Sequence, residues 1–240
     1  MSLLTRAGRR LRRGLSPTPR AIDSAPFALD HFNSLLSALT QQLGSGVFGS
    51  RGSARGLVLR LDLDTPECLQ RVHEFVCRAN AVGVTPVASF RVDGIPYPLE
   101  SAAQAIERLR ESGTLLALHS SCYLGQASPS AALDRLEQEL ETFRQVSGTP
   151  ARNLTFHGEG AQDAQVRSKV RERLMQGLAE SLELATDLPD SRWDYKYVFQ
   201  DCWRDQSGRR VIRADWASPR RFRQRSEDVL VLVHPGYWSA

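Results

Sequence analysis

Lysine is nearly missing from this chain. Lys169 and Lys196 are the only two among 31 basic residues, so arginine carries almost all of the positive charge. With 27 acidic residues the formal net charge is +4, and the arginines crowd into residues 6–20 and 220–225. Between these segments no face of basic residues interleaved with aromatic residues is present, so we expect no nucleic-acid partner. Residues 1–25 are predicted to form a flexible basic arm, for which weak attraction to an anionic membrane surface is an alternative role.

Cysteine is also scarce, and long apolar runs are absent. The four cysteines show no CxxC spacing and no dense pattern, which argues against a disulfide scaffold and predicts reduced thiols. No apolar run is long enough to span a bilayer, and residues 1–20 lack the apolar stretch of a secretion signal. These absences together predict a cytoplasmic protein.

Apolar residues follow helical and strand patterns in alternation, which predicts an α/β fold with parallel strands joined by crossover helices. We expect one domain over residues 26–240, which opens with a helix at 27–43. The further helices are expected at 66–81, 99–111, 130–146 and 164–178. The strands are expected at 56–64, 84–92, 114–121, 153–158, 182–186 and 229–233, with a hairpin formed by 195–200 and 210–213.

The strand at 56–64, with the sequence GLVLRLDLD, carries charge on one face. A period of two places Arg60, Asp62 and Asp64 on that face, and Pro66 ends the strand. Burying two carboxylates and a guanidinium is costly unless they have partners. Because parallel sheets place their chemistry at the carboxyl ends of their strands, the pattern indicates a site. The alternative is a solvated strand end with a surface Arg–Asp pair.

Three of the five histidines also end predicted strands, namely His119, His157 and His234. His31 and His73 lie in predicted helices and are interpreted as structural or surface residues. Asp62, Asp64 and Asp187 end strands in the same way, and in a parallel barrel all these ends meet at one mouth. Carboxylates combined with imidazoles suit a divalent cation such as zinc. These groups are the components of metal-assisted hydrolysis.

Three motifs in order resemble the polysaccharide deacetylase (NodB-homology) superfamily of carbohydrate esterases. They are RLDLD at 60–64, LALHSS at 116–121 and VHPGYW at 233–238. The chain looks most similar to the WbmS-like branch of surface-polysaccharide and O-antigen biosynthesis, over roughly residues 27–238. The resemblance implies a distorted (β/α) barrel that removes an N-acyl group from an amino sugar, either free or as a nucleotide-linked or lipid-linked glycan intermediate.

The resemblance also implies roles for individual residues. Asp62 would be the catalytic base and His234 the acid that protonates the leaving amine. Asp64 and His119 would bind the metal. The position four residues after His119, where the superfamily usually has its second metal histidine, is occupied by Tyr123.

His157 is therefore expected either to supply the missing imidazole ligand or to contact the substrate. The Arg-x-Pro-x-Gly motif of the superfamily is not recognisable around residues 152–158. Arg60, Tyr123, Asp187 and Trp238 are predicted to contact the substrate. Tyr123 as a weak metal ligand and Trp238 as a core residue are the alternatives.

Two other classes of protein remain open. Asp-x-Asp also marks glycosyltransferases that bind a metal–nucleotide-sugar complex, although these need no histidines at three other strand ends. A degenerate barrel that lost its metal would act as a carbohydrate-binding or assembly protein, which Tyr123 favours. Asp62, Asp64 and His234 argue against it, because an inactive protein has no need of desolvated ionisable groups.

Overall fold

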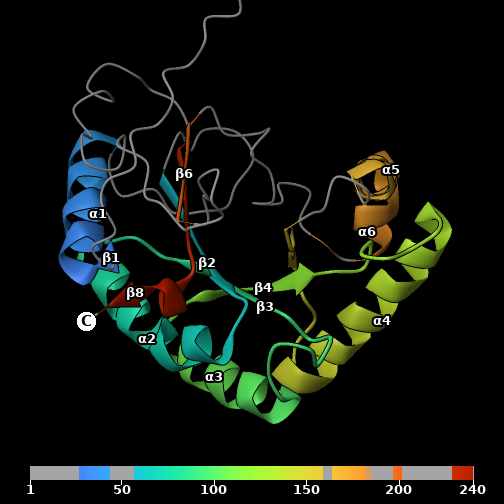
Figure 1. Cartoon of the computed structure of the whole chain (residues 1–240), viewed down its shortest axis with the longest axis horizontal. Helices are drawn as coiled ribbons and strands as arrows, with labels where there is room; N and C mark the ends of the chain where they lie inside the picture. The colour runs from blue at the N-terminus through green and yellow to red at the C-terminus, as the bar shows by residue number, and fades with distance from the viewer. Residues whose placement is uncertain are drawn as a thin grey trace, which may run out of the picture.

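The computed structural model describes residues 27–43, 57–158, 164–182, 184, 197–201 and 229–239. The predicted arm at residues 1–25 lies outside these ranges. The described residues form an α/β structure in which a curled parallel sheet makes a half-barrel, and α1 to α4 form an arc along its outer side (Figure 1). None of the described helices is long and apolar enough to cross a membrane.

The sheet has six strands in the order β5-β4-β3-β2-β7-β6, and all neighbouring pairs are parallel. The strands are β2 (Leu57–Leu63), β3 (Val87–Phe90), β4 (Leu115–Ser120), β5 (Asn153–Phe156), β6 (Tyr197–Gln200) and β7 (Val229–Val233). All seven residues of β2 are buried, as expected for a central strand of a parallel sheet. The expected barrel is present as an open half-barrel in the described residues, with β5 and β6 at its edges.

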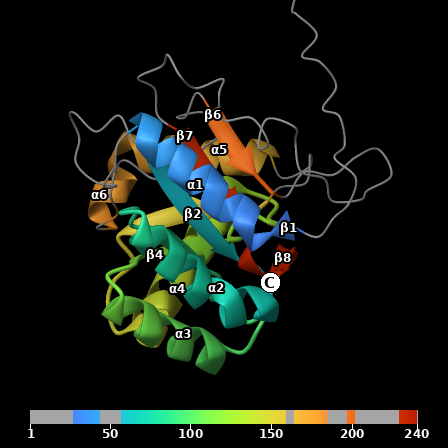
Figure 2. The same ribbon diagram turned by 90° about the vertical axis from the view of Figure 1, so that its left-hand side faces the viewer.

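The helices covering the sheet begin and end close to the predicted positions. They are α1 (Leu29–Leu43), α2 (Pro66–Ala81), α3 (Leu99–Glu111) and α4 (Pro129–Ser147). The start of α2 shows why the sequence forms a helix there. The hydroxyl of Thr65 accepts from the backbone N–H of Cys68, and Pro66 at the first turn needs no donor partner. Figure 2 shows α1 crossing in front of β2, on which it packs.

Three segments differ from their predicted form. The expected helix at 164–178 is divided into α5 (Ala164–Arg173) and a π-helix, η2 (Leu174–Leu178), and is followed by α6 (Ala179–Ser181). Within the segment expected as a strand at 182–186, Leu182 lies in a turn and Leu184 in no regular element. One half of the expected hairpin is β6, which pairs in parallel with β7, whereas residues 210–213 lie outside the described part.

The C-terminal segment is fixed against α2 and thereby positions the residue after β7. The segment comprises η5 (Pro235–Tyr237) and β8 (Trp238–Ser239), and β8 pairs in parallel with β1 (Phe27–Ala28). At Gly236 a Cβ atom would lie 2.9 Å from the backbone nitrogen of Cys68, so only glycine fits. The ring of Trp238 lies edge-on to Phe32 and Phe75 in the core. These contacts hold His234 at the carboxyl edge of the sheet.

Candidate active site

Alternate residues of β2 line one side of the site. Both Arg60 and Asp62 point to it, and their side chains are each only 4% exposed. The guanidinium donates from Nε and Nη2 to the two carboxylate oxygens over 2.5 and 2.6 Å. This burial contradicts the alternative of a solvated surface pair. Asp64 follows directly after the strand.

Three imidazoles from other strands surround Asp64. Its Oδ1 lies 3.4 Å from Nε2 of His119, in β4. Its Oδ2 lies 3.5 Å from Nε2 of His157, which follows β5, and 3.2 Å from Nε2 of His234, which follows β7. Because parallel strands end at the same edge and the sheet is curled, residues of β5 and β7 meet across the end of β2. The structure thus brings together five predicted site residues.

The hydroxyl of Thr155 and burial together determine the tautomer and the protonation state of His119. Its Nδ1 lies 2.7 Å from Oγ1 of Thr155, which donates its own proton to the carbonyl of Leu118. The hydroxyl oxygen therefore accepts the proton of Nδ1, so that Nε2 carries a lone pair facing Asp64. Burial lowers the pKa of His119 to about 4, although Asp62 and Asp64 act in the opposite direction. The imidazole is neutral at pH 7.

His234 is in the opposite state because Asp201 supports it. Oδ1 of Asp201 lies 2.6 Å from Nδ1, while Oδ2 accepts from the backbone N–H of His234 and from Nε1 of Trp238, both over 2.7 Å. Burial alone would lower the pKa of His234, but the Asp201 carboxylate, assisted by Asp64 and Asp62, holds that pKa well above its usual value. His234 is therefore protonated at neutral pH and presents an N–H at Nε2.

The two carboxylates of β2 remain ionised. Burial would raise the pKa of Asp62, yet the charge and hydrogen bonds of Arg60, together with the charge of His234, hold it below its usual value. Burial acts in the same way on Asp64, whose pKa is lowered strongly by hydrogen bonds from His157 and His234 and by the charge of His234. The site therefore contains a carboxylate paired with arginine at Asp62 and a second carboxylate at Asp64, whose ion-pair partners among the described residues are histidines.

Asp201 and Arg91 belong to the site, although sequence reasoning did not select them. Each directly follows a strand, β6 for Asp201 and β3 for Arg91. The rule used for the histidines could have found Asp201, which follows the segment expected at 195–200, whereas Arg91 lay inside the strand expected at 84–92. Nη2 of Arg91 pairs with Asp93 at 2.5 Å, and Nη1 lies 3.5 Å from Nε2 of His157.

Two predicted substrate contacts have other partners. Tyr123 is fully buried, and its hydroxyl donates to the backbone carbonyls of His157 and Gly158, so it supports the segment carrying His157. Trp238 is 2% exposed and packs in the core, which leaves no open ring face for a sugar. Asp187 lies outside the described residues. Arg60 lies at the site but pairs with Asp62.

The donor atoms suit a divalent cation. No group of three His, Cys, Asp or Glu side chains in the described ranges forms a ready-made metal site. However, Oδ1 of Asp64 and Nε2 of His119 are both buried and have no hydrogen-bond partner in the part of the chain that the structure describes, and they face each other at 3.4 Å. Two donors bound to one tetrahedral zinc at about 2.0–2.1 Å lie about 3.3–3.4 Å apart, so this pair fits the group. Nε2 of His157 lies at a similar distance from the other oxygen of Asp64.

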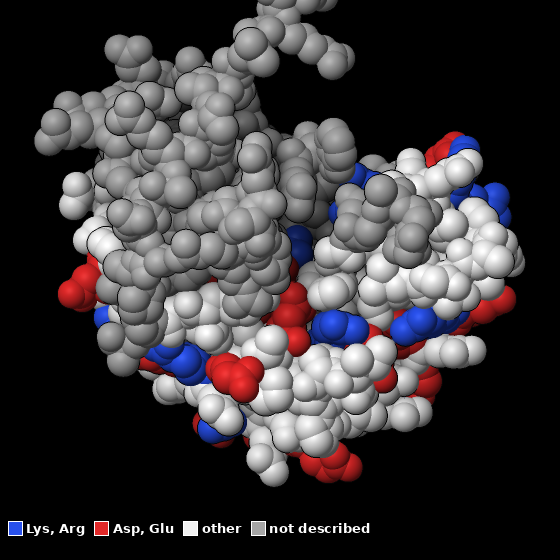
Figure 3. Space-filling model, viewed as in Figure 1, with Lys and Arg blue, Asp and Glu red and all other residues white. Residues whose placement is uncertain are grey.

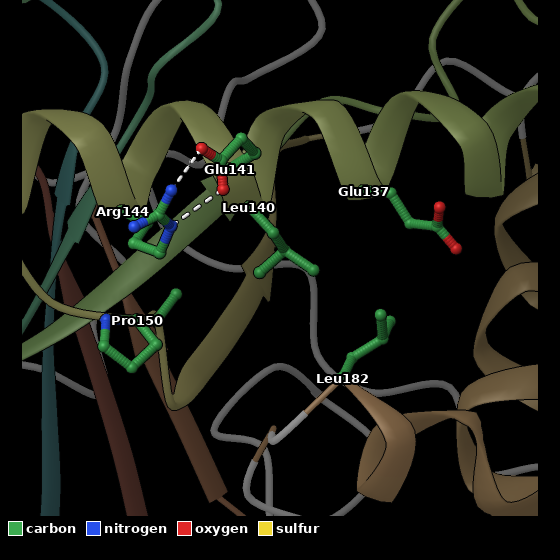
Figure 4. A pocket seen from close by; sticks show the side chains of 7 residues that line it. Glu137, Leu140, Glu141, Arg144, Pro150 and Leu182 are labelled. Atoms are coloured by element: carbon green, nitrogen blue, oxygen red, sulfur yellow. Dashed lines mark hydrogen bonds and ion pairs between the residues drawn. The ribbon is translucent and has the colours of Figure 1, made fainter.

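In Figure 3, acidic and basic side chains lie next to each other near the middle of the face shown. A separate pocket of about 290 Å³ lies beside α4 and is lined by Glu137, Leu140, Glu141, Arg144, Pro150, Ala151 and Leu182. Figure 4 shows side chains of this lining. Its one arginine is paired with Glu141, and none of these lining residues belongs to the histidine cluster.

No protein-family model matches the chain, and no curated protein is significantly similar to it in sequence.

Proposed function

We propose that this chain is a metal-dependent hydrolase that removes an N-acyl group, most simply acetyl, from an amino sugar in surface-polysaccharide biosynthesis. One observation carries the proposal. A buried, arginine-paired carboxylate and a buried, carboxylate-paired imidazolium lie 4.0 Å apart, between Asp62 Oδ2 and His234 Nε2. Such a pair supplies a base and an acid to opposite sides of one reacting amide. The motif resemblance assigns the same roles.

Asp62 acts as the general base. Its ionised state is maintained by Arg60, so it can accept a proton from the water that attacks the acyl carbon. The bidentate contact also fixes the orientation of the carboxylate. Because the arginine and the carboxylate lie on one rigid strand, the base is positioned before the substrate binds.

His234 acts as the general acid. As the C–N bond breaks, Nε2 gives its proton to the departing amine nitrogen, and the products are a carboxylate and a free amine. Asp201 keeps Nδ1 in place and stabilises the charged ring before the transfer. Tyr237, whose ring is stacked on the imidazole with centroids 4.6 Å apart, fixes the ring plane further.

Asp64, His119 and His157 are the residues that would hold the divalent ion, which we propose is zinc. The ion would supply Lewis acidity toward the acyl oxygen and make water a stronger acid. Thr155 orients His119 through Nδ1, which is the outer contact that a metal-binding histidine requires. Tyr123 supports His157 from behind through the backbone, so His157 replaces the second histidine that the resemblance leads one to expect.

A second candidate function is a carbohydrate-binding or assembly protein on the same scaffold. Tyr123 favours this candidate, because it occupies the position of the usual second metal histidine and its hydroxyl is bound to backbone carbonyls instead of facing a metal ligand. The two candidates differ in one respect: only the hydrolase releases an amine.

The test is release of primary amine from N-acetylated amino sugars, free and nucleotide-linked, by zinc-loaded protein. We expect Asp62→Asn and His234→Gln to reduce the rate by roughly 10²–10⁴-fold, the usual contribution of a general base or acid. His73→Gln, on the outer helix α2, is the matched control and should leave the rate unchanged. Binding of these sugars without amine release would support the binding protein instead. Full activity in Asp62→Asn would refute the assignment of the base.

A further inference from the structure

Arg91 is a second buried arginine at the site, and the reaction described above gives it no role. It is 8% exposed and directly follows β3. Its Nη1 lies 3.5 Å from Nε2 of His157, so the guanidinium reaches the group of residues around Asp64. A buried cation beside a proposed metal site is costly and would weaken cation binding there. It therefore calls for an explanation beyond packing.

A network of side chains fixes the position of this guanidinium. Asp93 accepts a hydrogen bond from Nη2 of Arg91 over 2.5 Å and another from the hydroxyl of Ser121 over 2.7 Å. Behind them, Glu139 accepts from the hydroxyl of Ser120 over 2.5 Å and from Nε of Arg135 over 3.2 Å. The arginine is thereby held at the site by fixed partners.

The donors of Arg91 are only partly used. Nη2 is engaged by Asp93, whereas Nε is buried and has no hydrogen-bond partner among the described residues. Within the same part of the chain, the contact of Nη1 is the long one of 3.5 Å with His157. A guanidinium has five N–H donors and no acceptor, so the partner that would satisfy the remaining donors is an oxyanion.

The charges of the site lead to the same partner. An anionic substrate would be repelled by Asp62 and Asp64 unless a cation with free donors lay beside them. Arg60 is occupied by Asp62, and His234 is occupied by Asp201 at one nitrogen and by Asp64 at the other. Arg91 is also paired, with Asp93, but through Nη2 alone, so among the described cations that reach this cluster it keeps Nε and Nη1 for a further partner.

We propose that Arg91 binds an anionic group of the substrate, a carboxylate or a phosphate, next to the N-acyl group. The substrate is then an acidic N-acyl amino sugar, and Arg91 determines the preference for it over a neutral one. The inference rests on the proposed function for the identity of the sugar. It is tested by binding, which does not require turnover.

The experiment compares three probes that share the N-acetyl group. N-Acetylglucosamine is neutral, N-acetylmuramic acid adds a carboxylate, and N-acetylglucosamine 1-phosphate adds a phosphate. Their affinities are measured by calorimetry on the zinc-loaded His234→Gln protein, which slows turnover and keeps the Arg60–Asp62 pair intact. We expect at least one acidic probe to bind about tenfold more tightly than the neutral one, the size expected for a charge-assisted contact. Which acidic probe is preferred identifies the source of the anion.

Variants of Arg91 then decide the role. Arg91→Gln should abolish the preference while leaving the affinity for N-acetylglucosamine within about threefold, since a neutral sugar makes no charge-assisted contact. Arg144→Gln, an exposed arginine on α4, is the control and should retain the preference. Arg91→Lys keeps the charge but loses the planar fork, so it should lower the preference. If Arg91→Gln does not fold, the lysine variant decides.

Two results would overturn the inference. One is equal affinity of His234→Gln for all three probes, and the other is a preference that survives in the variants of Arg91. Neither would bear on amine release by the wild-type protein. Conversely, an Arg91-dependent preference for acidic probes, together with no amine release by the wild-type protein, would support the anion site and refute the hydrolase.

Discussion

The Arg60–Asp62 pair offers a stability test whose magnitude follows from its geometry. Both side chains are 4% exposed and share two short hydrogen bonds. Arg60→Met would leave the carboxylate of Asp62 buried without its main partner, which costs about 3–5 kcal/mol of unfolding free energy. The double variant Arg60→Met with Asp62→Asn removes that charge. It should be more stable than the sum of the single changes predicts, by about 2–3 kcal/mol.

The pH dependence of the same variants gives a second check. In the wild type the pKa of Asp62 is lowered, so its stabilising contribution is present above the unfolded-state pKa and is lost as pH falls through the lower folded-state value. Without Arg60, burial raises that pKa instead. A protonated Asp62 is cheaper to bury, so the loss caused by Arg60→Met should be larger at pH 7 than at pH 5. Urea unfolding followed by tryptophan fluorescence measures both effects.

Additive effects of the two substitutions on the unfolding free energy would refute this reasoning. If the double variant equals the sum of the single variants to within about 0.5 kcal/mol, the two side chains are not energetically coupled. The arginine would then not be what keeps Asp62 ionised, and the assignment of Asp62 as a prepositioned base would lose its support.

Three further predictions concern other buried groups. Tyr123→Phe should lower the unfolding free energy by about 1–2 kcal/mol in urea, because the carbonyl of His157 loses its donor; an unchanged value would contradict the contact. Burial raises the pKa of Glu139, with Asp93 acting in the same direction and Arg135 in the opposite one. The contribution of Glu139 to the unfolding free energy should therefore fall as pH rises from about 4.5 through its higher folded-state pKa, and the fall should be less steep in Glu139→Gln. Burial also raises the pKa of Cys122 to about 12, so in mass mapping at pH 8 iodoacetamide should modify exposed Cys77 before Cys122.

Much of the fold could be predicted because the sheet is parallel and central. Strands buried on both faces leave uninterrupted apolar runs, as in 229–233, where the predicted and observed bounds agree. The amphipathic pattern and N-terminal proline of α2 and the apolar face of α3 likewise gave the correct bounds. The two-residue strand β1 was missed, because a parallel bridge to β8 depends on tertiary packing and leaves no periodic signal.

The site was predictable only where polar residues ended a recognisable strand. Asp62, Asp64 and the three histidines meet because each lies at the carboxyl edge of the sheet. Arg91 was missed because the strand was expected to continue to residue 92, which placed the arginine inside it.

The role of an aromatic residue could not be read from its type. Trp238, close to His234 in the sequence, was predicted to contact the sugar. The pairing of β8 with β1 instead places its ring in the core beside Phe32. Likewise, only the fold shows that the hydroxyl of Tyr123 reaches the backbone of His157, 34 residues away. Such roles depend on long-range contacts, which local pattern does not encode.

Metal content of the purified protein tests the central claim most directly. The account predicts about one zinc or other divalent ion per chain after incubation with the metal, and loss of that ion in Asp64→Ala and in His119→Ala. His157→Ala should weaken binding as well, whereas His73→Ala should not. Full metal retention in Asp64→Ala and His119→Ala, or no binding by the wild type, would contradict the account.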